Sequence, residues 1–185
     1  KPTIICGVTR VFERIYDGIQ KKLNEQPFII RAIFKSAYYS KSFLTHYLRI
    51  KHVPGLDSIF NSVCNALGGC VRLFVCGGSA LPEEIQCFLR IACRASFLQG
   101  YGLTESTSSI CVQTSTDVLE GNCGALIPWA EAKLRSVDHY KASDMSGELL
   151  VRGSSIFEGY YKDEEATKSV FTKDGFFMTG DIFKL

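Results

Sequence analysis

The residues best suited to chemistry lie close together in the stretch 99–106, which reads QGYGLTES. The planar ring of Tyr101 could stack on a base, Thr104 could donate a hydrogen bond to a phosphate oxygen, and Glu105 could bind a hard cation such as Mg²⁺. Taken alone, the stretch fits equally well a glycine turn in which Thr104 and Ser106 only bond to the backbone. Its surroundings must decide between the two interpretations.

Two glycine loops are predicted to meet at one edge of a parallel sheet. The apolar run 95–98 predicts a buried strand, and the glycines that follow it predict a loop. A second apolar run, 70–76, predicts another buried strand, which ends in the glycine loop 77–80 before Pro82 opens a helix. Parallel strands deliver their following loops to the same edge, where α/β proteins bind ligands. The two loops could therefore form two walls of one cleft.

The part of the chain before these loops has helical patterns. Apolar residues recur at helical spacing over 11–23 and 30–48, and a third helix is expected over 59–67, capped by Asp57 or Ser58 and ended by two glycines. Together with the two strands, these helices indicate an α/β fold. We expect residues 1–112 to form part of a parallel-sheet α/β layer with long helices.

After about residue 111 the pattern changes to short alternating strands and turns, as at 131–137 and 147–153. Residues 113–185 are therefore predicted to form a β-rich subdomain that is part of a barrel. Near its end, Asp181 follows Thr179-Gly180. An acidic residue after a glycine turn can accept both hydroxyl groups of a ribose.

Composition and charge exclude several classes of protein. The chain has 185 residues, of which 46% are hydrophobic and 22% charged, which is neither disordered nor fibrous. Its eight cysteines include no CxxC pair, and this favours free thiols in a reducing, intracellular compartment over zinc or disulfide frameworks. No apolar run is long enough to span a bilayer, and no signal peptide opens the chain.

The charge is unevenly distributed along the chain. The net charge is +2, yet the first 52 residues hold ten basic and three acidic residues. This asymmetry could mark a face for anionic lipid or nucleic acid, but the basic residues are dispersed, which favours solvated helix faces. We expect no nucleic acid partner and keep peripheral membrane contact as an alternative.

Four motifs, in this order, resemble those of the adenylate-forming superfamily, which includes acyl-CoA synthetases, luciferases and peptide-synthetase adenylation domains. They are GGSALP at 77–82, QGYGLTE at 99–105, GELLVRG at 147–153 with Gly159-Tyr160, and TGD at 179–181. Lys1-Pro2-Thr3 and the segment GVTRVFERIY at 7–16, followed by a long helical excursion, most resemble eukaryotic-type long-chain fatty acyl-CoA synthetases. The resemblance spans nearly the whole chain.

The resemblance implies a role for each residue that matches a motif. Tyr101 and the glycine loop 77–80 would sandwich adenine. Thr104 would contact the α-phosphate, Glu105 would bind Mg²⁺, and Asp181 would hold the ribose hydroxyls. Thr104 and Glu105 would be the catalytic residues. The remaining nucleotide-binding positions are Gly77, Gly78, Ser79 and Ala80 in the first loop and Gln99, Gly100 and Gly102 in the second.

The implied activity is that of a long-chain fatty acid:CoA ligase, which uses ATP to form an acyl-adenylate and then transfers the acyl group to coenzyme A. The family's upstream phosphate loop and downstream mobile domain have no counterpart here. An internal fragment is therefore expected, inactive alone and working with the rest of the same polypeptide. Two alternatives remain: another adenylating ligase for an aryl or amino acid, and a non-catalytic nucleotide-binding module. The implied location is the cytosolic side of the cell, including the surface of the endoplasmic reticulum or a peroxisome.

Overall fold

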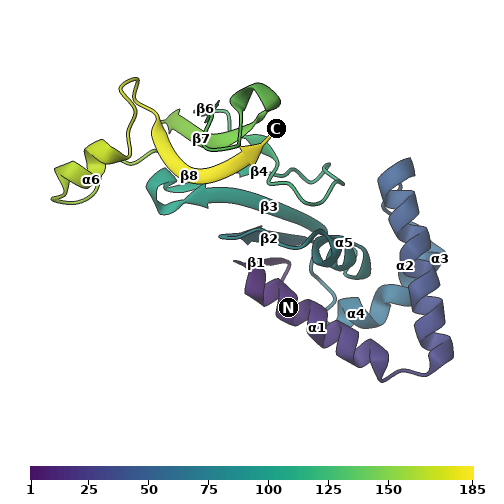
Figure 1. Ribbon diagram of the computed structural model, residues 1–185. Coiled ribbons are helices and arrows are strands. Elements are labelled where there is room, and N and C mark those ends of the chain that lie inside the picture. Colours follow the sequence, from purple (N-terminus) through teal and green to yellow (C-terminus); the bar gives the residue numbers. More distant parts are fainter. The chain divides into compact units, whose positions relative to one another are not determined.

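The computed structural model describes residues 1–185, which form two compact units. Unit 1 comprises residues 1–101 and 112–124, and unit 2 comprises residues 102–111 and 125–185. The division into domains 1–112 and 113–185 that the sequence suggests stays a prediction. Each unit is described by itself (Figure 1).

The centre of unit 1 is a parallel sheet. Ile4 of the first strand pairs with Leu73 of the second, and Leu73 pairs with Ser96 of the third, all in the same direction. These strands are β1 (Ile4–Val8), β2 (Leu73–Gly77) and β3 (Ser96–Leu103). The full strand order is β1-β2-β3-β4-β5, in which β4 (Ser108–Val112), except for Val112, and β5 (Ala125–Leu126) belong to unit 2. The predicted α/β class with a parallel layer is confirmed.

Three helices confirm the helical patterns of the sequence: α1 (Thr9–Asn24), α2 (Phe28–Leu48) and α5 (Glu83–Ala92). The ring of Phe12 in α1 is fully buried and meets Phe74 of β2 and Phe97 of β3 edge-on, with centroid distances of 5.8 and 4.9 Å. The second long helix packs against α5, and Phe34 and Phe88 face each other across that contact at 6.3 Å. None of the helices has the length and apolar character that crossing a membrane requires.

The third predicted helix is broken into three short pieces, which are α3 (Pro54–Asp57), η1 (Ser58–Phe60) and α4 (Asn61–Ala66). The prediction that Asp57 or Ser58 caps it is wrong, since neither side chain forms a capping bond there. Instead the Asp57 carboxylate forms a buried ion pair with Lys41 of α2 and accepts a hydrogen bond from the Val53 amide at 3.1 Å. Burial alone would raise the pKa of the Asp57 carboxyl, but the hydrogen bond and charge of Lys41 hold it below the usual value.

Unit 2 contains an open antiparallel sheet of three strands in the order β6-β7-β8, and no closed barrel. The middle strand is almost entirely buried, with Leu149, Leu150 and Val151 each at most 3% exposed. The strands are β6 (Ala130–Arg135), β7 (Ser146–Gly153) and β8 (Phe177–Lys184), accompanied by the short helices η2 (Thr104–Ser106), η3 (Ala142–Asp144) and α6 (Glu164–Ser169). The β-rich character predicted for this part of the chain is present.

Candidate functional site

The first predicted site segment, residues 77–80, follows β2 directly. The chain turns at Gly78, whose φ of +92° lies in the left-handed region that disfavours side chains. A Cβ added to Gly77 would lie 3.9 Å from the carbonyl oxygen of Gly100 in β3, so these two glycines are neighbours. Ser79 and Ala80 are exposed. Within unit 1 the structure therefore brings the glycine loop against Gly100, as expected for two adjacent parallel strands.

Two side chains hold this loop in place. The Thr9 hydroxyl, on the first residue of α1, donates a hydrogen bond to the Ser79 carbonyl at 2.8 Å and accepts one from the Ser79 hydroxyl at 2.8 Å. The amide N–H of Leu81 donates to Oε1 of Gln99 at 3.4 Å. Since Gln99 is only 6% exposed, its side chain supports the loop from the inside.

Gln99 belongs to a buried network of three glutamines. Oε1 of Gln113 accepts a hydrogen bond from the backbone N–H of Gln99 at 2.9 Å and another from the side-chain Nε2 of Gln86 at 2.7 Å. Nε2 of Gln113 donates to the Leu119 carbonyl at 2.9 Å, whereas Oε1 of Gln86 is buried without a partner. This network links the strand that carries the second site segment to α5 and to the segment after β4.

The loop predicted over residues 99–106 is wrong for 99–103, because β3 continues as a strand through Leu103. Gly102 permits a close approach of two strands and not a turn: an added Cβ would lie 1.8 Å from the carbonyl oxygen of Ser108. The turn itself is the short helix η2, in which the Ser106 hydroxyl accepts from the Leu103 N–H at 2.9 Å and donates to the Ser108 carbonyl at 2.7 Å. The backbone bonds predicted for Ser106 are therefore present.

The two predicted catalytic residues both lie in η2. Thr104 is exposed and Glu105 is half-buried. Oε1 of Glu105 accepts a hydrogen bond from the Tyr160 hydroxyl at 2.9 Å, and this bond and the nearby negative charge raise the pKa of the Tyr160 phenol. No cationic side chain forms an ion pair with Glu105. No cationic side chain therefore competes with a metal ion for this carboxylate.

Asp181 lies within β8, at an irregularity of the ladder and not after a simple turn. Glu148 pairs with Ile182 and Leu150 pairs with Met178, so three residues of β8, 179–181, face Leu149 alone. Gly180 adopts a left-handed φ of +75°. Bonds involving side chains replace the missing ladder contacts: Thr179 Oγ1 to the Leu149 carbonyl at 2.8 Å, and the Gly180 amide to Oε1 of Glu148 at 3.1 Å. This bulge presents Asp181 at the surface.

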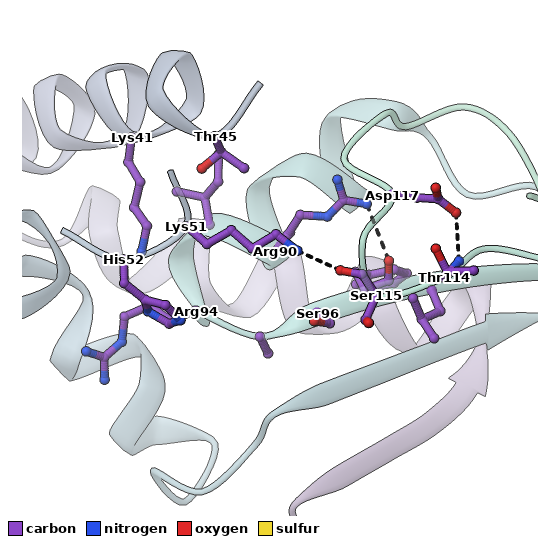
Figure 2. A pocket seen from close by; sticks show the side chains of 14 residues that line it. Lys41, Thr45, Lys51, His52, Arg90, Arg94, Ser96, Thr114, Ser115 and Asp117 are labelled. Carbon is purple, nitrogen blue, oxygen red and sulfur yellow. Dashed lines mark hydrogen bonds between the residues drawn. The ribbon is translucent and has the colours of Figure 1, made fainter. Parts of the chain in front are cut away.

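A cavity of about 80 Å³ lies elsewhere in unit 1, at the amino end of β3 (Figure 2). Its basic side chains come from α2, α5 and the residues that follow these two helices, and the segment after β4 contributes polar residues. Lys51 donates to the Ser115 carbonyl at 2.6 Å, and the Thr114 amide donates to the Asp117 carboxylate at 2.7 Å. Its lining includes Ser96, the first residue of β3, and none of the predicted site residues. The cavity is therefore separate from the candidate site.

Residues 1–161 match the sequence profile of a family described as AMP-binding enzyme. The chain belongs to the AMP-binding enzyme family. It is 38% identical to long chain acyl-CoA synthetase 4 of Arabidopsis thaliana, over 98% of the chain and 28% of that relative. It is 36% identical to fatty acyl-CoA synthetase B of Dictyostelium discoideum, with the same coverage of 98% and 28%.

Solved structures agree with this family assignment. The adenylation domain of a carboxylate reductase from Mycobacterium chelonae is similar with a TM-score of 0.69 and 27% identity, over 98% of this chain and 25% of that one. The corresponding domain from Segniliparus rugosus, in complex with AMP and a co-purified carboxylic acid, gives a TM-score of 0.63 and 26% identity, over 98% and 25%. The chain spans about 28% of the length of the first relatives. The resemblance to adenylate-forming enzymes is confirmed.

Proposed function

We propose that the chain forms part of an ATP-dependent long-chain fatty acid:CoA ligase. The support is its identity of 36–40% to six relatives named long chain acyl-CoA synthetases, in each case over 98% of the chain. In a protein of the relatives' length, the fatty carboxylate attacks the α-phosphorus of ATP and pyrophosphate leaves. The thiol of coenzyme A then attacks the acyl carbonyl carbon and AMP leaves.

Each residue keeps the role that the motif resemblance implies for it. The turn at Gly78 exposes the backbone of the 77–80 loop, against which adenine would pack, with Tyr101 on its other face. The exposed Thr104 hydroxyl would donate a hydrogen bond to an α-phosphoryl oxygen, where negative charge develops in the transition state. Asp181, presented by the bulge of β8, would accept hydrogen bonds from the ribose hydroxyls.

Mg²⁺ would be held by Glu105. A carboxylate oxygen is the ligand type that this hard ion prefers, and the only side-chain partner described for Glu105 is the neutral hydroxyl of Tyr160. When bound, the ion would supply positive charge next to the phosphoryl oxygens. The Tyr160 hydroxyl would orient the carboxylate by holding Oε1.

The test uses a protein of the relatives' length that contains this chain. Pyrophosphate release is measured with a panel of long-chain, aryl and amino acids, and the highest kcat/KM is expected with a long-chain fatty acid. A preference for an aryl or amino acid would instead support the other adenylating ligases, and no acid-dependent release would support a non-catalytic module.

Two variants test the residue assignments in the same assay. Glu105→Gln is expected to lower kcat by about 100-fold or more, whereas Glu165→Gln, at an exposed position in α6, leaves it unchanged. Asp181→Ala is expected to raise the KM for ATP by about 10- to 100-fold without a comparable rise for the fatty acid. Equal rises in the KM values for ATP and for the fatty acid would contradict the assignment of Asp181 to the ribose.

A further inference from the structure

Three side chains able to bind a metal ion converge in unit 1, outside the residues proposed for the nucleotide. They are His46 in the last turn of α2, Cys87 in α5, and Glu120 in the segment after β4. The Nε2, Sγ and carboxylate oxygen atoms all lie within 4.8 Å of one another, and Nε2 of His46 is 2.8 Å from Oε2 of Glu120. Ligand atoms around a tetrahedral zinc ion are about 3.3–3.8 Å apart, so side-chain shifts of about 1 Å suffice.

The two helices that carry His46 and Cys87 are in direct contact and lie side by side (Figure 1). Each of the three side chains is also held by a further partner, as metal ligands usually are. These contacts are Nδ1 of His46 to the Ser42 carbonyl at 2.8 Å, Nη1 of Arg90 to Oε1 of Glu120 at 3.0 Å, and the Tyr38 hydroxyl to Sγ of Cys87 at 3.4 Å.

Both ring nitrogens of His46 face oxygen atoms that can accept a hydrogen bond. Nδ1 lies 2.8 Å from the Ser42 carbonyl oxygen, and Nε2 lies 2.8 Å from Oε2 of Glu120. A metal ion between Nε2 and Oε2 would bind both atoms. The carboxyl end of a helix favours a cation at this position.

We propose that His46, Cys87 and Glu120 bind one divalent transition-metal ion, with Zn²⁺ as the best match. A neutral imidazole, a thiolate and a carboxylate together neutralise the two positive charges of the ion. The sulfur ligand argues against Mg²⁺ and Ca²⁺, which prefer oxygen, and nitrogen with sulfur suits zinc. Three protein ligands leave one position for water. The ion would connect α2, α5 and the segment after β4, which is a function separate from the proposed ligase chemistry.

The test is a metal titration of the reduced, chelator-treated chain. Co²⁺ is used first, because a bond from thiolate to cobalt gives a charge-transfer absorption band, and Zn²⁺ affinity is then measured by competition. One ion per chain is expected, and the cobalt band is expected to disappear in Cys87→Ser. We expect His46→Gln and Tyr38→Phe to weaken Zn²⁺ binding by about 10- to 100-fold.

The matched controls are Cys70→Ser and His52→Gln, which alter exposed residues outside the cluster and should leave both measurements unchanged. Alkylation of the unaltered chain, followed by mass spectrometry, gives a result that does not depend on whether a variant folds. Zn²⁺ is expected to slow alkylation of Cys87 by more than about 10-fold, with Cys6 and Cys70 unaffected. A cobalt band that survives in folded Cys87→Ser, or no selective protection of Cys87, would overturn the proposal and leave His46 and Glu120 as a hydrogen-bonded pair.

Discussion

Replacing Gln113 by methionine is expected to destabilise unit 1 far more than the same replacement of Gln86, although the two side chains are hydrogen-bonded to each other at 2.7 Å. Both are buried, at 2% and 0% exposure. Methionine has a similar length and is apolar, so in each variant the packing volume is kept and the polar groups are lost. The difference between the two variants therefore measures what each amide does for its neighbours.

Gln113→Met would leave two buried donors without an acceptor, the Gln99 amide N–H and Nε2 of Gln86. Each orphaned group costs about 1–3 kcal/mol, so the loss is about 2–6 kcal/mol. Gln86→Met would remove only one hydrogen bond, because Oε1 of Gln113 still accepts from Gln99. It also removes a buried oxygen that has no partner. The two effects offset each other, and the expected change is within about 1 kcal/mol of zero.

The assay is urea unfolding of the 185-residue chain, followed by circular dichroism. The unfolding midpoint of Gln113→Met should fall well below that of the unaltered chain, while the midpoint of Gln86→Met stays close to it. Thr114→Ala, at an exposed neighbouring position, controls for substitution in this segment. Equal midpoints for the two methionine variants would refute the reasoning, since they would mean that the orphaned donors find water or other partners.

Three further changes test other parts of the molecule. Glu105→Gln should change the free energy of unfolding by less than about 0.5 kcal/mol. It should also lower the pKa of Tyr160 toward the ordinary tyrosine value, which ultraviolet titration of tyrosinate measures. An unchanged pKa would contradict the hydrogen bond between Tyr160 and Glu105. Lys41→Met should cost about 3–5 kcal/mol at neutral pH, because it leaves the Asp57 carboxylate buried without its partner. The folded-state pKa of Asp57 is lowered, so the ion pair contributes stability above about pH 4, and this stability is lost as the pH falls through the lowered pKa. Chemical unfolding at several pH values should therefore show that the difference in unfolding free energy between the variant and the unaltered chain becomes smaller in acid. Gly102→Ala should cost about 1–3 kcal/mol or more in the same unfolding assay, because its Cβ would lie 1.8 Å from a backbone oxygen of β4, and unchanged stability would mean that the strands separate easily.

The sequence predicted the long helices well because apolar residues recur in them at helical spacing, and α1 buries such a face. Phe12 and Ile19 of α1 are examples, with exposures of 0% and 8%. It failed where a contact between distant residues decides the structure. The ion pair of Asp57 with Lys41 joins residues 16 positions apart, and nothing in the local pattern distinguishes this carboxylate from a helix cap.

Glycine explains the other error in the fold. Its presence signals either a turn or a close approach of two chains, and sequence alone does not separate these uses. At Gly78 the positive φ shows a turn, as predicted, whereas at Gly102 the nearby strand requires the missing side chain.

The predicted site residues depended on motif order, but the side chains that position them were missed. Thr9 and Tyr160 both lie within motif segments noted in the sequence, yet only coordinates show that Thr9 ties down the 77–80 loop and that Tyr160 holds Glu105. Gln99 was assigned to the nucleotide, but its buried side-chain oxygen Oε1 instead accepts a hydrogen bond from the backbone N–H of Leu81. Spacing can suggest a motif, but it does not give the direction in which a side chain points.

The bulge of β8 that contains Asp181 could be removed without changing the strand on either side of it. Three residues, 179–181, face one residue of β7, so the bulge adds two residues to a regular ladder. An insertion of two residues leaves the side chains of Met178 and Ile182 on the sheet faces that they would occupy without it. An insertion of one residue would move every later side chain of the strand to the opposite face. A lineage could therefore lose this acidic residue by deleting two codons and still keep the sheet. The bonds from Thr179 to Leu149 and from Gly180 to Glu148 would be lost with the bulge, so such a deletion would test its structural role together with that of Asp181.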